Sequence, residues 1–182
     1  LQALGGYDWD RLPDKDKNEI AAALYGSGLE EMRAENIREV AVQLQNHFGA
    51  VTLEPLQSWS DDECVKFLTG LPGVGTKTAL CVEMYALDRQ VFPADAHCIR
   101  VLKRMGVLPT QVQHRPAQRL LATLVPAEVA YKLHVNLVAH GQQVCKARRP
   151  RCDQCAVQEF CHVPNGQVAE PDAPHRTTRH AT

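Results

Sequence analysis

"LPGVGTKTAL", residues 71–80, ends one helical pattern and begins another, with only the turn Leu71-Pro72-Gly73-Val74-Gly75 between them. Glycine allows positive φ values and lets a backbone approach another molecule closely. The first N–H groups of the following helix lack partners within that helix, so they form a site for an anion. The turn is therefore either a simple connection between two helices or a phosphate-binding site, and a DNA backbone phosphate is the expected ligand.

Helical patterns flank this turn over most of the chain. Apolar residues recur at helical spacing from Ile37 to Phe48, which predicts a helix over 31–48. Ser60 and Glu63 have the spacing of a capping box at the start of the helix before the turn. Further helices are expected at 14–25, 77–87, 96–105, 115–124 and 127–142, and only 51–53 gives a weak strand signal. The predicted fold class is all-α.

Charge is distributed unevenly, although the formal net charge is only −1. Residues 99–151 carry ten basic side chains and one acidic side chain, whereas residues 1–98 carry eight basic and sixteen acidic ones. Such a block is typical of a nucleic-acid-binding face, and the alternative is a solvated basic surface. No apolar run approaches the roughly 20 residues of a membrane helix, so a soluble intracellular protein is expected.

Four of the seven cysteines lie within 17 residues, with the spacing Cys145-x6-Cys152-x2-Cys155-x5-Cys161. Disulfides fit an intracellular protein poorly. Four thiolates so close in sequence suit either Zn²⁺ or a [4Fe–4S] cluster, and the spacing alone does not choose between them. The other cysteines, Cys64, Cys81 and Cys98, fall on helical patterns and are expected to be small buried apolar residues.

A short basic segment separates the first two cysteines of this group. It contains Lys146, Arg148, Arg149 and Arg151. A metal site that stiffens the segment would position these cations for phosphates before binding. The alternative is that they only make the loop soluble.

An amine and a carboxylate follow the glycine turn. Lys77 falls in the first turn of the second helix, where the helix dipole disfavours an ammonium ion. Partial burial and positive surroundings would lower the pKa of this amine and release a nucleophile; otherwise Lys77 pairs with phosphate. Asp95 suits the N-cap of the next helix, and its carboxylate also suits stabilisation of positive charge at a sugar carbon.

The combination of LPGVG, KTA, the DAH at 95–97 and the four-cysteine spacing resembles the endonuclease III family of DNA glycosylases, in the helix-hairpin-helix superfamily. The resemblance covers most of residues 1–163 and implies two all-α domains with a DNA cleft between them. It implies that 71–75 and Thr76 contact the DNA backbone, that Lys77 is the Schiff-base nucleophile, and that Asp95 is the catalytic aspartate. The four cysteines become ligands of a [4Fe–4S] cluster, and Leu29 becomes an apolar wedge that fills the base stack.

The resemblance also implies an organisation and a function. A helical barrel domain is expected at 1–106, the remaining helices and the cluster loop at 107–163, and a disordered tail at 164–182. The family's first helix has no counterpart here, and its next helix is absent or reduced to LQALGG. If this sequence is the whole protein, exposed apolar surface and weak activity are expected; if it is a fragment, the full protein should be normal. The implied activity is excision of damaged bases, with oxidised pyrimidines as the family's usual substrates, and strand cleavage by β-elimination.

The implied partner is double-stranded DNA that contains a damaged base or an abasic site, and a monomer without membrane contact is expected. The implied location is the cytoplasm, with the nucleoid, in a bacterium, and otherwise wherever DNA is housed. Two alternatives remain at this point. One is a DNA-binding protein that keeps the hairpin and the metal site but does no chemistry, and the other is a structural domain clamped by zinc.

Overall fold

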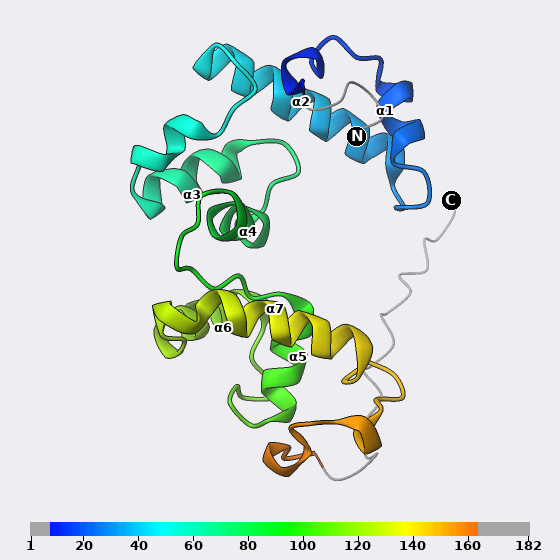
Figure 1. Ribbon diagram of the computed structural model, residues 1–182, viewed down its shortest axis with the longest axis vertical. Coiled ribbons are helices and arrows are strands. Elements are labelled where there is room, and N and C mark those ends of the chain that lie inside the picture. Colours follow the sequence, from blue (N-terminus) through cyan, green and yellow to red (C-terminus); the bar gives the residue numbers. More distant parts are fainter. Residues whose placement is uncertain (1–7, 164–182) are drawn as a thin grey trace, which may run out of the picture. The chain divides into compact units, whose positions relative to one another are not determined.

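The computed structural model describes residues 8–163, and every regular element in that range is helical (Figure 1). The α-helices are α1 (Lys17–Ala23), α2 (Glu30–Phe48), α3 (Asp61–Gly70), α4 (Thr76–Ala86), α5 (Ala96–Arg104), α6 (His114–Leu124) and α7 (Ala127–Gln143). The short 3-10 helices are η2 (Trp9–Arg11), η3 (Glu54–Ser58), η4 (Cys152–Gln154) and η5 (Gln158–Phe160). The all-α prediction is confirmed. The strand signal at 51–53 is wrong, because this segment bends and leads into η3.

The chain packs as two compact units, unit 1 (Leu1–Pro93) and unit 2 (Ala94–Thr182). Among the described residues, unit 1 holds α1 to α4, and unit 2 holds α5 to α7 with the four-cysteine loop. The domain boundary expected at residue 106 falls after α5 and stays a prediction, because a packing unit need not coincide with a functional domain. The tail expected to be disordered, 164–182, lies outside the described residues.

Helix ends are fixed by residues that the sequence already shows. The Ser60 hydroxyl accepts the N–H of Glu63, and the Glu63 carboxylate accepts the N–H of Ser60 at 2.9 Å, so the capping box is confirmed. Gly49 ends α2 with a φ of 79°, and Gly106 follows α5 with a φ of 74°. Both glycines adopt the left-handed conformation that commonly terminates helices.

Unit 1 is held by two apolar clusters. In one, α1 packs on α2 through Ile20 and Ala34, which have no exposed surface. In the other, α3 packs on α4 through Cys64 and Ala79, together with Leu71 from the turn between these helices. Because Leu71 is buried, the turn is anchored in the core at its first residue.

Arg89, just after α4, ties that helix to the segment around the start of α3. Its guanidinium donates to Glu83 at 3.1 Å, to Asp61 at 2.8 Å, and to the carbonyl oxygens of Leu56 and Trp59 at 2.7 and 2.6 Å. Glu83 has no exposed surface, and its Oε2 has no hydrogen-bond partner among the described residues. Burial raises the pKa of Glu83, with a further contribution from Asp61, and Arg89 opposes the rise. One partly buried cation therefore helps to hold α3 against α4.

Unit 2 is organised around α5, which packs on α7 and on α6. Cys98 of α5 is fully buried, with its sulfur 3.8 Å from Nδ1 of the buried His134 on α7. Cys64 and Cys98 are therefore the small buried residues that the sequence predicts, whereas Cys81 is only partly buried.

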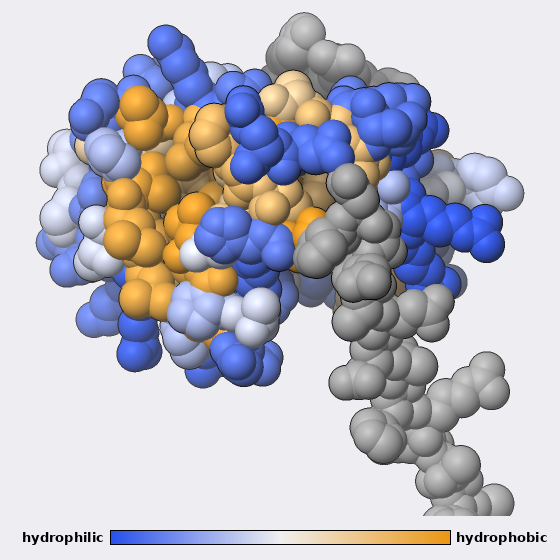
Figure 2. Space-filling view, turned by 90° about the horizontal axis from the view of Figure 1, so that it is seen from below, coloured by the Kyte–Doolittle hydropathy of each residue, from blue (hydrophilic) through white to orange (hydrophobic). Residues whose placement is uncertain are grey.

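Apolar side chains are exposed on both units. They include Tyr25 and Leu29 in unit 1 and Leu120 and Leu124 in unit 2. In the view of Figure 2, apolar side chains are exposed among polar ones. Between residues 8 and 163, no helix combines the length and the apolar character needed to cross a bilayer.

Candidate functional site

The turn between α3 and α4 depends on two glycines that have different roles. Gly73 has a φ of 72°, and a Cβ at this position would overlap the side-chain amide of Asn36 on α2. Gly73 is therefore required both by its backbone conformation and by the close approach of Asn36. Gly75 is the N-cap of α4 and provides no side-chain cap. Its lack of a side chain leaves room for an anion at the first N–H groups of α4.

Lys77 is the second residue of α4. No acidic residue lies in the first turn of this helix, so no carboxylate there offsets the positive end of the helix dipole. The side chain is exposed, so the partial burial expected from the sequence is not observed.

Asp95 is the N-cap of α5, and its Oδ1 accepts the N–H of His97 at 2.8 Å. The predicted capping role is confirmed. The residue before it, Ala94, is buried and donates its N–H to Oε1 of Gln118 on α6 at 2.7 Å. Gln118 thus fixes the segment that leads into Asp95, and sequence inspection missed it because only the fold brings α6 to this segment. Lys77 belongs to unit 1 and Asp95 to unit 2.

The loop before α2 presents Leu29, the expected wedge. Leu29 has a left-handed backbone conformation, with a φ of 58°, which is unusual for a residue other than glycine. Its side chain is 66% exposed. The Glu30 carboxylate accepts the N–H groups of Gly26 and Gly28, both at 3.0 Å. Hydrogen bonds from the N–H groups of Glu30 itself and of Gly28 lower the pKa of Glu30, so an ionised carboxylate holds this loop.

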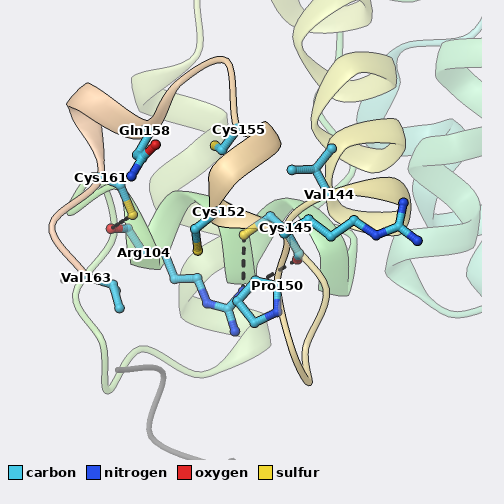
Figure 3. Close-up of a pocket in the computed structure, with 10 residues that line it drawn as sticks. Arg104, Val144, Cys145, Pro150, Cys152, Cys155, Gln158, Cys161 and Val163 are labelled. Atoms are coloured by element: carbon cyan, nitrogen blue, oxygen red, sulfur yellow. Dashed lines mark hydrogen bonds between the residues drawn. The ribbon is translucent and has the colours of Figure 1, made fainter. Parts of the chain in front are cut away.

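The four predicted metal ligands, Cys145, Cys152, Cys155 and Cys161, line one pocket (Figure 3). Between residues 8 and 163, no three His, Cys, Asp or Glu side chains are grouped closely enough to hold one metal ion. A zinc site would need four sulfurs about 2.3 Å from one atom. Four thiols around a pocket suit the larger iron–sulfur cluster.

Two arginines of α5 fasten the first cysteine of this pocket. Arg104 donates to the Cys145 sulfur at 3.1 Å (Figure 3), and to the carbonyl oxygens of Lys146 and Ala147 at 2.8 and 3.1 Å. Arg100 donates to the Cys145 carbonyl oxygen at 3.0 Å. Charged donors of this kind stabilise a thiolate and orient it as a ligand.

A histidine contacts a second cysteine of the pocket. The Cys155 sulfur lies 3.6 Å from Nε2 of His140 on α7. Burial lowers the pKa of His140, which favours the neutral ring. Sequence inspection missed both Arg104 and His140, because they reach the cysteines only once α5 and α7 pack against the loop.

The basic segment between Cys145 and Cys152 is held by its main chain. The N–H groups of Lys146 and Arg151 both donate to the Val144 carbonyl oxygen, at 2.8 and 2.9 Å. Arg148, Arg149 and Arg151 are exposed, whereas Lys146 is partly buried. Three of the four predicted cations therefore project into solvent from a fixed loop.

Substitution of Arg104→Ala should weaken retention of the cluster, because it removes the donor to the Cys145 sulfur and two bonds that hold the loop. We expect the absorbance near 400 nm to disappear about 10- to 100-fold faster in the presence of an iron chelator. Lys103→Ala is the matched control, since it removes a positive charge from the same helix without a bond to the loop. Equal bleaching rates for the two variants would contradict this role of Arg104.

Two family models match the chain. The model described as HhH-GPD superfamily base excision DNA repair protein matches residues 2–127, and the iron–sulfur binding domain of endonuclease III matches residues 145–161. The second match covers the four cysteines and decides against the zinc alternative.

Individual relatives agree with these models. Endonuclease III of Sulfolobus acidocaldarius is 31% identical over 163 residues, which are 88% of this chain and 69% of that protein. DNA glycosylase/AP lyase ROS1 of Arabidopsis thaliana is 25% identical over 171 residues, which are 85% of this chain and 12% of that much longer protein.

Solved structures share the fold. A structure of a non-covalent endonuclease III–DNA complex matches with a TM-score of 0.72 and 25% identity, over 86% of this chain and 69% of that chain. A thermostable thymine-DNA glycosylase matches with a TM-score of 0.71 and 25% identity, over 87% and 70% of the two chains. The glycine turn, the cysteine pocket and these matches agree, and the chain belongs to the endonuclease III family of base-excision-repair DNA glycosylases, with that family's iron–sulfur binding domain.

Proposed function

We propose that this glycosylase is bifunctional: it removes oxidised or ring-saturated pyrimidines and then cuts the strand as an AP lyase, with Lys77 as the nucleophile. The observation that carries the proposal is the amine in the first turn of α4, directly after the glycine turn. A lysine that attacks a sugar carbon forms an imine, and only an imine leads to strand cleavage by the enzyme.

DNA is bound in this proposal through three elements. The N–H groups at the start of α4 and residues 72–76 of the turn hold one stretch of phosphates, whereas Leu71, predicted as a DNA contact, is buried and anchors the turn. Arg148, Arg149 and Arg151 meet further phosphates from the fixed cluster loop, with Lys146 beside them. Leu29 enters the space that the damaged base leaves when it turns out of the stack.

The chemistry then takes two stages. The neutral Lys77 amine forms a bond to C1′, the bond from C1′ to the base breaks, and the base leaves with the electron pair and takes up a proton. Loss of the amine proton and opening of the sugar give an imine between Lys77 and C1′. Asp95 stabilises positive charge at the sugar and assists proton transfer.

The imine makes the C2′ proton acidic. Removal of this proton breaks the bond from C3′ to oxygen, so the 3′ phosphate departs and the strand is cut. Water finally releases Lys77. The reaction needs no external oxidant or reductant.

A strand-cleavage assay with and without alkali tests the proposal. The substrates are duplexes with one ring-saturated pyrimidine, one G·T mismatch, or no lesion. We expect cleavage at the saturated pyrimidine without alkali. Cleavage that requires hot alkali would indicate a monofunctional glycosylase, preference for the mismatch would overturn the substrate class, and binding without any base release would leave a non-catalytic DNA-binding protein.

A further inference from the structure

Three exposed apolar side chains lie within residues 25–32, and the proposed mechanism uses only one of them, Leu29. Tyr25 is 92% exposed, and Leu29 and Met32 follow it at 66% and 54%. We define these three side chains as the 25–32 patch. Single exposed apolar residues are common on protein surfaces, whereas three within eight residues mark a candidate interaction site.

The backbone beneath the patch is held in place. The Glu30 carboxylate accepts two N–H groups of the loop, and Arg33 donates from Nη1 to the Ser27 carbonyl oxygen at 3.0 Å. Leu29 keeps its left-handed conformation within this framework. An apolar side chain on a restrained loop loses little conformational entropy when it binds, so the arrangement favours recognition over loose exposure.

The patch lies on the same unit as the glycine turn, and α2 connects the two. One groove of unit 1 is lined by Arg33 and Asn36 of α2 and by Pro72, Gly73 and Val74 of the turn. Asn36 contacts Gly73, as described above. In Figure 1 the loop before α2 lies at the right-hand end of unit 1, and the turn between α3 and α4 lies nearer the middle of the unit. In the proposed function, DNA that is held at the turn also meets Leu29, and Tyr25 lies four positions before Leu29 in the same loop.

The chemistry of the patch selects bases rather than phosphates. Glu30 and Glu31 adjoin Leu29, so phosphates are repelled here, whereas an aromatic ring and two apolar side chains suit the face of an unstacked base. We infer that Tyr25, four positions before Leu29, is a second stacking residue and that it binds the unpaired base opposite the lesion. This inference rests on the proposed function, in which Leu29 occupies the emptied stack.

Binding to a duplex with one tetrahydrofuran abasic analogue tests the inference, because this analogue cannot form an imine and strand cleavage plays no part. Tyr25→Ala should weaken binding to the analogue duplex about 5- to 100-fold, with no change for an undamaged duplex. Tyr25→Phe keeps the ring and should bind within about twofold of the original protein. A 2-aminopurine opposite the analogue should be quenched by the original protein and by Tyr25→Phe but not by Tyr25→Ala.

Tyr131→Ala is the matched control, since Tyr131 is 49% exposed on α7 in unit 2. Unchanged affinity of Tyr25→Ala for the analogue duplex would overturn the inference. An equal loss on damaged and undamaged duplexes would also overturn it, because Tyr25 would then be a general contact. Loss in Tyr25→Phe would exclude stacking as the cause. This binding test does not depend on strand cleavage. Failure of the proposed function would appear in the strand-cleavage assay and not here.

Discussion

Lys77→Gln should abolish covalent trapping of this protein on DNA and lower strand cleavage more than about a thousandfold, the scale on which loss of a catalytic nucleophile acts. Glutamine keeps the length and polarity of the side chain but cannot form an imine. Because Lys77 is exposed, the substitution should leave the free energy of unfolding unchanged within about 0.5 kcal/mol. The measurement is borohydride trapping on a duplex with one abasic site, with DNA affinity determined in parallel.

The same experiment separates a nucleophile from a phosphate contact. If Lys77 only pairs with phosphate, Lys77→Gln should weaken binding and reduce the salt dependence by about one unit, while trapping persists in proportion to occupancy. Lys66→Gln is the matched control, since Lys66 is an exposed lysine on α3 in the same unit. Persistent trapping in Lys77→Gln would place the nucleophile elsewhere.

Arg89→Ala should destabilise the protein by about 3–5 kcal/mol, the usual result when one partner of a buried ion pair is removed. The substitution removes the guanidinium that donates to the fully buried Glu83 carboxylate, and it also leaves the carbonyl oxygens of Leu56 and Trp59 without this donor. Urea unfolding measures the loss. Glu83→Met combined with Arg89→Ala removes the stranded charge and should recover at least half of it.

The pH dependence of the same variant gives a second check. Burial raises the pKa of Glu83 in the folded state, so the folded protein binds more protons than the unfolded chain above pH 4 or so. Its free energy of unfolding therefore falls as the pH rises through this window. Arg89 lowers this pKa, so Arg89→Ala should extend the window upward and steepen the decline. The free energy of unfolding of Arg89→Ala should fall more with pH than that of the double variant, which lacks Glu83. An equal fall in the two variants would contradict this role of Glu83.

Local signals predicted most of the fold. The capping box at Ser60, the N-cap at Asp95 and the glycines at 49 and 106 each act within a few residues, so helix positions could be read from the chain. The weak strand signal at 51–53 did not lead to a strand, because a strand needs a pairing partner and residues 8–163 provide none.

The site was predictable where chemistry is local and not where packing supplies it. The four cysteines, the basic segment and the turn could be identified from spacing alone. Gln118 behind Asp95, Arg104 against Cys145 and the Glu83–Arg89 pair depend on helices that meet only in the fold. No local sequence pattern predicts such contacts, because each partner is an ordinary polar residue in its own segment.

The most direct test of the central claim, that Lys77 forms the imine, is peptide mapping of the borohydride-reduced adduct. Trypsin does not cleave after a modified lysine, so the account predicts that residues 67–89 appear as one peptide carrying the mass of the DNA remnant on Lys77. A remnant on any other lysine, or cleavage after Lys77 in an adduct that is clearly covalent, would contradict it.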